Sequence, residues 1–98
     1  MAEANEIIHQ SVRLQIMSAL IASSEPLEFT RLKAVARATD GNLGAHLNTL
    51  ERAGYINIHK DFVGKKPRTC ASITRAGRHA FQRHIEYLRD IVDTHREA

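Results

Sequence analysis

The middle third of the chain restricts its possible folds more than any other part. Leu43, Leu47 and Leu50 recur there with the i, i+4, i+7 spacing of one helix face. This spacing predicts an amphipathic helix from Asp40 to Ala53, with Thr39 placed to cap its first turn. Two strand-like stretches joined by a basic loop come directly afterwards. A helix that runs at once into a charged hairpin is therefore expected.

The hairpin is predicted from two stretches with alternating side chains, residues 55–60 and 69–73. The loop expected between them, 62–68, has Gly64 for the bend and Pro67 where no backbone donor is needed. The cations expected to crowd around its tip are Lys60, Lys65, Lys66 and Arg68. Because like charges at one tip repel each other unless an anion relieves them, phosphate contact is expected there.

The rest of the chain has mainly helical patterns. The other expected elements are a first helix from about residue 6 or 11 to 22, a brief strand at 27–28, a short helix over 29–36, and a last helix from about 75 to 93. The predicted fold class is thus mainly α with a small β-hairpin.

Length and composition favour one small globular domain over residues 1–98. The 98 residues, 43% of them hydrophobic, are enough for a core without disulfide bonds. No apolar run approaches the roughly 20 residues that cross a bilayer, and the N-terminus has no basic segment followed by an apolar one. A soluble, cytoplasmic protein without a membrane partner is expected. Cys70 is alone, so no internal disulfide is possible.

Charge is distributed unevenly along the chain. Residues 52–83 contain eight Lys or Arg against one Asp or Glu, whereas acidic residues outnumber basic ones before and after this block. Concentrated positive charge attracts polyanions, which fits a nucleic-acid partner. A basic block can also be an ordinary solvated face, so the block alone does not decide between the two.

Opposite its leucines, the helix predicted over 40–53 presents small and polar side chains. They are Gly41, Asn42, Ala45, Asn48, Thr49 and Arg52. One α-helix fits the major groove of duplex DNA, where Asn can bond adenine twice and small residues allow close approach. The alternative is a plain solvated face.

Several short motifs, taken in their order along the chain, resemble those of the small winged-helix DNA-binding proteins related to the MarR and ArsR transcription regulators. The motifs are Asp40-Gly41-Asn42-Leu43, His46-Leu47, Leu50-Glu51, Ala53-Gly54-Tyr55, the run from Phe62 to Thr69, Ile73-Thr74 and Ala76-Gly77-Arg78. The resemblance spans about residues 12–81. It implies a winged helix-turn-helix that dimerises on a pseudo-palindromic operator, with helix 40–53 in the major groove and the 60–68 wing on the backbone or minor groove. Such proteins commonly repress transcription. His46 is the histidine that matches the family, and it is expected to pack or to contact a DNA phosphate as part of the recognition helix.

The chain departs from this family on the outer face of the recognition helix. Similar proteins often have Ser and basic residues there, whereas this chain has Gly44, Ala45, Asn48 and Thr49. Fewer phosphate anchors remain on the helix. Supporting phosphate contacts are therefore expected from the region of the short second helix, at Arg31, Lys33 and Arg37.

The last helix has a wider apolar face than one small domain can cover. With the apolar N-terminal segment, it predicts a homodimer interface formed by Ile7, Ile8, His84, Tyr87, Leu88, Ile91 and Val92. A two-fold dimer would set two recognition helices about 34 Å apart, one turn of DNA. The alternative is a monomer whose last helix packs only on the first.

Other function classes lack support in the sequence. The six histidines form no His-x-x-x-His pair, and Cys70 has no cysteine partner, so neither a metal nor another cofactor is expected. No nucleophile motif or phosphate-binding loop indicates an enzyme. A small-molecule effector is possible but has no support in the sequence. The sequence thus predicts a sequence-specific regulator of transcription, a repressor, with a winged-helix protein-interaction module that does not bind DNA as the alternative.

Overall fold

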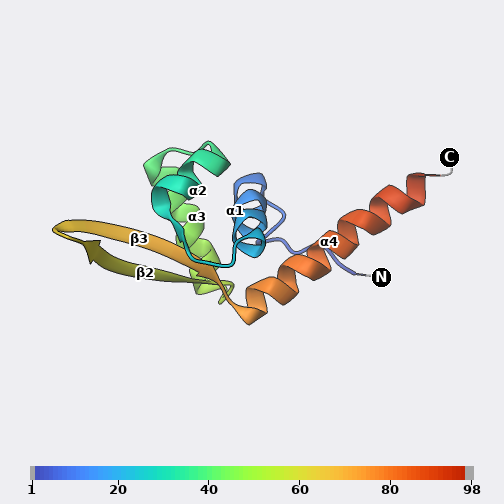
Figure 1. Cartoon of the computed structure of the whole chain (residues 1–98). Coiled ribbons are helices and arrows are strands. Elements are labelled where there is room, and N and C mark those ends of the chain that lie inside the picture. Colours follow the sequence, from blue (N-terminus) through green and yellow to red (C-terminus); the bar gives the residue numbers. More distant parts are fainter. Residues whose placement is uncertain (1, 97–98) are drawn as a thin grey trace.

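Three short helices form the body of the molecule, and a hairpin and a long helix leave it in opposite directions (Figure 1). The computed structural model describes residues 2–96. Its elements in order are α1 (Ser11–Ala22), β1 (Leu27–Glu28), α2 (Phe29–Ala36), α3 (Asp40–Arg52), β2 (Ile56–Val63), β3 (Lys66–Ile73) and α4 (Arg75–His95). The expected fold class, a mainly α winged helix with a hairpin, is confirmed.

Threonine side chains cap the N-termini of α3 and α4, the two helices that flank the hairpin. Thr39 Oγ1 accepts a hydrogen bond from the backbone N–H of Asn42 at 3.2 Å, and Thr74 Oγ1 accepts one from Gly77 at 2.9 Å. Each bond satisfies a backbone donor that has no partner within its own helix. The Thr39 cap agrees with the sequence prediction, and α1 begins at the later of its two expected starts.

The core lies between α1, α2, α3 and the base of the hairpin. All three leucines of the α3 stripe are buried, and Ile16 and Met17 of α1 are completely buried beside them. Ile56 and Ala71 close the core from the sheet. The leucine spacing therefore identified the inner face of α3 correctly.

The hairpin strands are longer than the sequence predicted, and the expected loop over 62–68 was wrong. Both strands continue to the tip, with Val63 paired to Lys66, so the turn contains only Gly64 and Lys65. Gly64 has φ 64°, the backbone conformation that a two-residue hairpin turn demands. Pro67 lies outside the part of β3 that pairs with β1. Its missing N–H therefore leaves no gap in the β1–β3 ladder.

A close contact fixes α4 to the base of the hairpin. The Thr74 N–H donates to the carbonyl of Tyr55 at 3.0 Å, and the Thr74 hydroxyl donates to the carbonyl of Gly54 at 2.7 Å. Gly77 lies so near that a Cβ on it would overlap the Tyr55 carbonyl oxygen. Only glycine permits this approach, so the direction in which α4 leaves the body depends on residue 77.

The N-terminal segment, residues 5–9, covers one face of α4 within the same chain. Ile8 and His84 are both completely buried there. The expectation that they line a dimer surface is corrected, because both side chains are core residues of a single chain. No helix within residues 2–96 has the length and apolar character needed to cross a membrane.

Candidate nucleic-acid interface

The outer face of α3 is open to solvent and carries few charges. Its exposed residues are Gly41, Asn42, Ala45, Asn48 and Arg52. Thr49 is half-buried, and its hydroxyl donates to the carbonyl of Ala45 at 3.1 Å. The Thr49 methyl group and the Asn48 amide therefore remain for contact with a base edge.

His46 is the one expected α3 contact that is tied into the body. Arg13 Nη1 lies 3.0 Å from His46 Nδ1, and Arg13 Nε donates to the Ile7 carbonyl. Because a guanidinium can only donate, Nδ1 accepts and the ring proton lies on Nε2. Burial, and secondarily the Arg13 charge, lower the pKa of His46. His46 is therefore neutral at pH 7 and joins α3 to α1.

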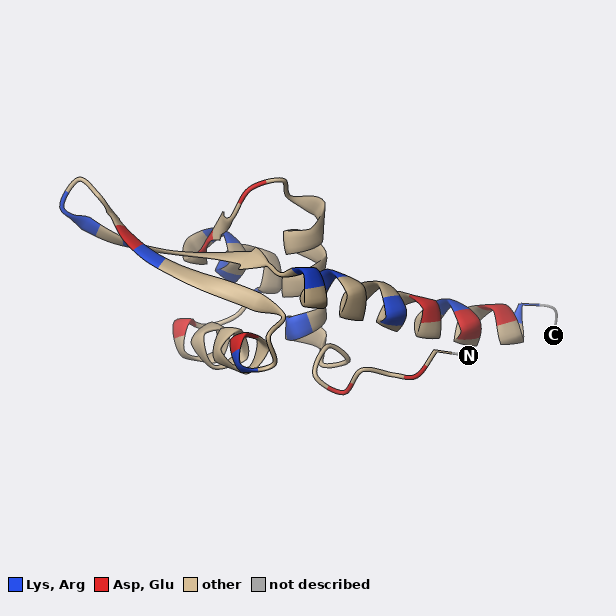
Figure 2. Cartoon of the chain, turned by 90° about the horizontal axis from the view of Figure 1, so that it is seen from below, with Lys and Arg blue, Asp and Glu red and all other residues tan. Residues whose placement is uncertain are grey.

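The wing, defined here as residues 56–73, has three exposed lysines: Lys60, Lys65 and Lys66. Two of them meet at the tip, where Figure 2 shows basic residues gathered. A narrow two-stranded arm with cations at its end can reach a polyanion without moving the body.

Arg68 is not the free cation of the wing that the sequence suggested. Its guanidinium donates to both carboxylate oxygens of Asp61 across the strands, at 3.0 and 2.7 Å, and lies 3.7 Å from Glu28. These bonds raise the pKa of Arg68, and the hydrogen bond from Arg68 lowers the pKa of Asp61. Asp61 and Arg68 face each other in the register, so their charges neutralise one another.

The supporting cations near α2 differ in their availability. Lys33 Nζ lies 2.7 Å from an Asp40 carboxylate oxygen, which joins the end of α2 to the start of α3. Arg31 and Arg37 are exposed. Arg37 adopts a left-handed backbone conformation, with φ 52°, at the turn after α2. Of the three, Arg31 and Arg37 are better placed to bind phosphate.

The sequence interpretation left Arg75 and Arg78 out of the candidate site, although both belong to its basic block. They are exposed in the first turn of α4, at the base of the wing. Figure 2 shows the basic residues in the first part of α4 and most of its acidic residues towards the C-terminal end. The charge pattern along the chain could have identified these two arginines.

Within residues 2–96, no group of three His, Cys, Asp or Glu side chains gathers at metal-binding distance. His9 and His84 approach each other, with Nδ1 of His9 3.4 Å from Nε2 of His84. However, His84 Nδ1 accepts a hydrogen bond from the Asn5 N–H, so its proton lies on Nε2. That nitrogen has no lone pair for a metal in this arrangement.

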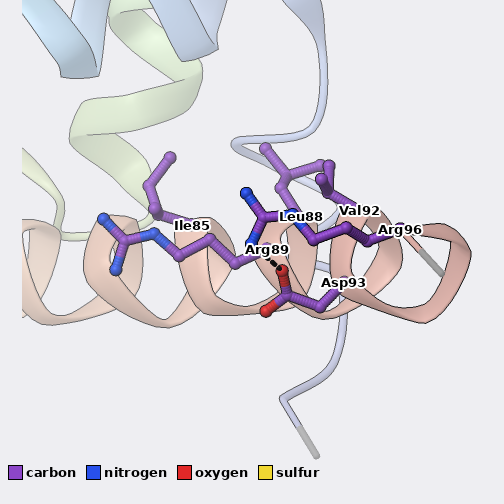
Figure 3. Close-up of a pocket in the computed structure, with 6 residues that line it drawn as sticks. All are labelled: Ile85, Leu88, Arg89, Val92, Asp93 and Arg96. Atoms are coloured by element: carbon purple, nitrogen blue, oxygen red, sulfur yellow. Dashed lines mark ion pairs between the residues drawn. The ribbon is translucent and has the colours of Figure 1, made fainter.

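The second half of α4 projects from the body (Figure 1), and some of its apolar side chains are exposed to solvent. Ile91 is 43% and Val92 61% exposed, while Tyr87 and Leu88 are half-buried. A shallow hollow runs along this part of the helix (Figure 3). It is lined by Ile85, Leu88, Arg89, Val92, Asp93 and Arg96. Such a surface on a small domain is typical of an interaction site.

Comparison with known proteins identifies a family. A family model described as a winged helix DNA-binding domain matches residues 12–92. An uncharacterised protein of Methanocaldococcus jannaschii is 38% identical over 80 residues, which cover 82% of this chain and 86% of that protein.

Two solved structures share the fold. The transcriptional regulator homologue protein of Pyrococcus horikoshii has a TM-score of 0.82 and 31% identity, over 92% of this chain and 88% of that chain. A protein of Salmonella typhimurium assigned as a transcriptional regulator has a TM-score of 0.73 and 20% identity, over 91% and 77%. Neither these structures nor the family model describes an enzyme.

Proposed function

This chain belongs to the winged helix DNA-binding domain family, and from this premise we propose that it is a transcription regulator that binds duplex DNA as a homodimer and represses transcription. The observation that carries the proposal is the exposed, polar and weakly charged outer face of α3 beside a wing with lysines at its tip. The 31% identity to the Pyrococcus horikoshii transcriptional regulator homologue supports the regulatory part.

In this proposal α3 enters the major groove. Asn42 and Asn48 offer amides for hydrogen bonds to base edges, and Gly41 and Ala45 let the backbone come close. Arg52, at the end of the helix, contacts phosphate. His46 supports the helix through Arg13 and offers a neutral Nε2–H to the DNA.

The wing and the α2 region supply the contacts that do not depend on sequence. Lys60, Lys65 and Lys66 bind phosphates beside the groove, and Arg31 and Arg37 bind phosphates from the α2 region. Because few cations lie on α3 itself, these outer contacts provide most of the electrostatic affinity.

The proposed dimer forms through α4. Leu88, Ile91 and Val92 give the apolar part of the interface, with Tyr87 and Ile7 at its edge. The long helix holds this surface away from α3, so a second copy can pack there while both recognition helices stay free (Figure 1). Two such helices about 34 Å apart would read a pseudo-palindromic operator. A dimer on a promoter represses by excluding other proteins.

The test is selection from a pool of random duplexes, with binding followed by fluorescence anisotropy at two salt concentrations. Salt-sensitive binding and enrichment of an inverted repeat are expected. Enrichment of a single half-site would contradict the dimeric arrangement, and no binding at low salt would contradict the DNA-binding proposal.

A protein-interaction module is the second candidate function. Its support is that Lys33 and Arg68, two of the expected cations, are already paired with carboxylates. Tight binding of a protein partner through α3, without DNA binding at low salt, would favour it.

A further inference from the structure

The tip of the wing carries large apolar side chains that the fold does not use. Phe62 is 71% and Val63 56% exposed, and both lie next to the two-residue turn. Single exposed apolar residues are common, but an exposed phenylalanine at the end of a projecting arm gains nothing from burial in the chain. We propose that Phe62, backed by Pro67, is a wedge that enters the DNA minor groove and bends the duplex.

The strand register shows which way this wedge faces. Phe62 pairs with Pro67, and the next pair on the same face of the hairpin is Lys60 with Thr69. Further along this face come Ile58 and Ala71, and then Ile56 and Ile73, which pack against the core. Phe62 and Pro67 are therefore on the side of the sheet that the helices cover, beyond the point where the helices end (Figure 1).

The opposite face of the tip is different. It carries the Asp61–Arg68 ion pair, followed by Val63 opposite Lys66. Val63 thus points away from the side on which α3 lies. The two faces provide a matched pair of exposed apolar residues, one on the helix side and one on the far side.

Charge at the tip selects the occupant. Lys60, Lys65 and Lys66 surround Phe62 in sequence, and the single nearby carboxylate, Asp61, is neutralised by Arg68. A polyanion with an apolar interior satisfies both the lysines and the phenyl ring. Duplex DNA has this chemistry, with phosphates outside and stacked bases inside.

The narrow turn at the tip favours insertion into the minor groove. That groove is about 6 Å wide in B-DNA, and a two-residue turn is the narrowest end a hairpin can have. Pro67 brings no N–H that would need a partner in the groove. Apolar side chains inserted between base steps unstack them and kink the duplex by roughly 20 to 90°. This inference rests on the proposed function, because it specifies what the wing does once α3 is bound.

The experiment measures DNA shape separately from DNA affinity. A duplex carrying the selected site is labelled at both ends for energy transfer, and 2-aminopurine is placed at the step beneath the wing. Binding of the wild-type chain should raise end-to-end transfer and 2-aminopurine fluorescence. Phe62→Ala should abolish most of both signals and leave the salt dependence of binding unchanged, whereas Phe62→Leu should keep part of both.

Val63→Ala is the matched control, since it removes an exposed apolar side chain from the far face, and both signals should stay as in the wild type. Bending and unstacking that survive Phe62→Ala, with tight binding intact, would overturn the wedge and leave the DNA-binding proposal standing. Equal loss in Phe62→Ala and Val63→Ala would also overturn it, because position on the helix side would not matter. A wild-type chain that binds no duplex would overturn the proposed function itself.

Discussion

The backbone N–H of Asn5 donates a hydrogen bond to Nδ1 of His84, 3.1 Å away, and so joins the N-terminal segment to the middle of α4. The Asn5 amide also donates to the hydroxyl of Tyr55 at 2.9 Å, at the base of the hairpin. His84 stacks on Tyr87, with ring centroids 5.7 Å apart, and its Nε2 faces His9. A buried imidazole is thus held in its neutral form between the N-terminal segment and its own helix.

Acidification should therefore destabilise the fold. Burial, and then the charge of His9, lower the pKa of His84 below its usual 6.5, and the pKa of His46 is lowered as well. In the unfolded chain both imidazoles take up a proton near pH 6.5, but in the folded chain they do so only at lower pH. The free energy of unfolding should be constant above about pH 7 and fall as the pH drops below 6.5. Urea titrations between pH 5 and 8 measure it.

His84→Gln is the control for this pH dependence, since its amide can accept from Asn5 but does not titrate. Its free energy of unfolding should be lower at neutral pH but fall less on acidification. If the free energy of unfolding of this variant fell on acidification as steeply as that of the wild type, His84 would not be responsible for the pH dependence. Asp61 does not interfere, because its lowered pKa affects stability only below about pH 4.

Gly77→Ala should destabilise the chain by about 2 kcal/mol or more, because the new methyl group meets the Tyr55 backbone and cannot move aside. Gly44→Ala is the matched control. Gly44 lies in the interior of α3, and a Cβ added there would have open space around it, so this substitution should stabilise the chain by up to about 1 kcal/mol. Chemical denaturation measures the free energy of unfolding of both variants. If Gly77→Ala left the free energy of unfolding unchanged, α4 would have to leave the hairpin along another path.

Removal of the two lysines at the wing tip, Lys65→Ala with Lys66→Ala, should weaken binding to all duplexes. If each contacts one phosphate, the slope of log affinity against log salt should fall by about 2. Asp61→Ala with Arg68→Ala removes an internally neutral pair and should leave that slope nearly unchanged. Anisotropy titrations at four salt concentrations distinguish them. An unchanged slope in the lysine variant would remove the wing from the interface.

Asn48→Ala should change which sequences are preferred. Loss of a bidentate contact to one base costs roughly 1 to 3 kcal/mol of discrimination at that position and leaves the salt slope intact. Asn57→Ala, an exposed asparagine on the outer side of β2, should alter nothing. Repeated selection and sequencing gives the comparison. The same site logo for wild type and Asn48→Ala would show that α3 does not read bases through this residue.

Ile91→Glu with Val92→Glu should produce a folded monomer, because both side chains are exposed in one chain and would place carboxylates in an apolar interface. Sedimentation should change from twice 11.0 kDa to 11.0 kDa. His79→Glu with Gln82→Glu adds the same charge at exposed positions nearer the body and should remain dimeric. A wild-type chain of 11.0 kDa at micromolar concentration would disprove the dimer.

Much of the candidate site could be predicted because it depends on local pattern. The inner and outer faces of α3 follow from the spacing of Leu43, Leu47 and Leu50, and its start follows from Thr39. The pairing of Arg68 with Asp61 was harder to predict. It depends on a two-residue turn that brings Asp61 directly opposite, and the assumed longer loop would have separated the two strands there.

The sequence by itself determined the order of the elements, the cap and the buried side of α3, and the basic character of the wing, since each comes from residues within a few positions of one another. Only the tertiary structure decided that His84 is enclosed by Asn5, that Gly77 touches Tyr55, and that Arg13 holds His46. These contacts join residues 22 to 79 positions apart. No local periodicity encodes such pairs, because they arise only when the packed body brings distant segments together.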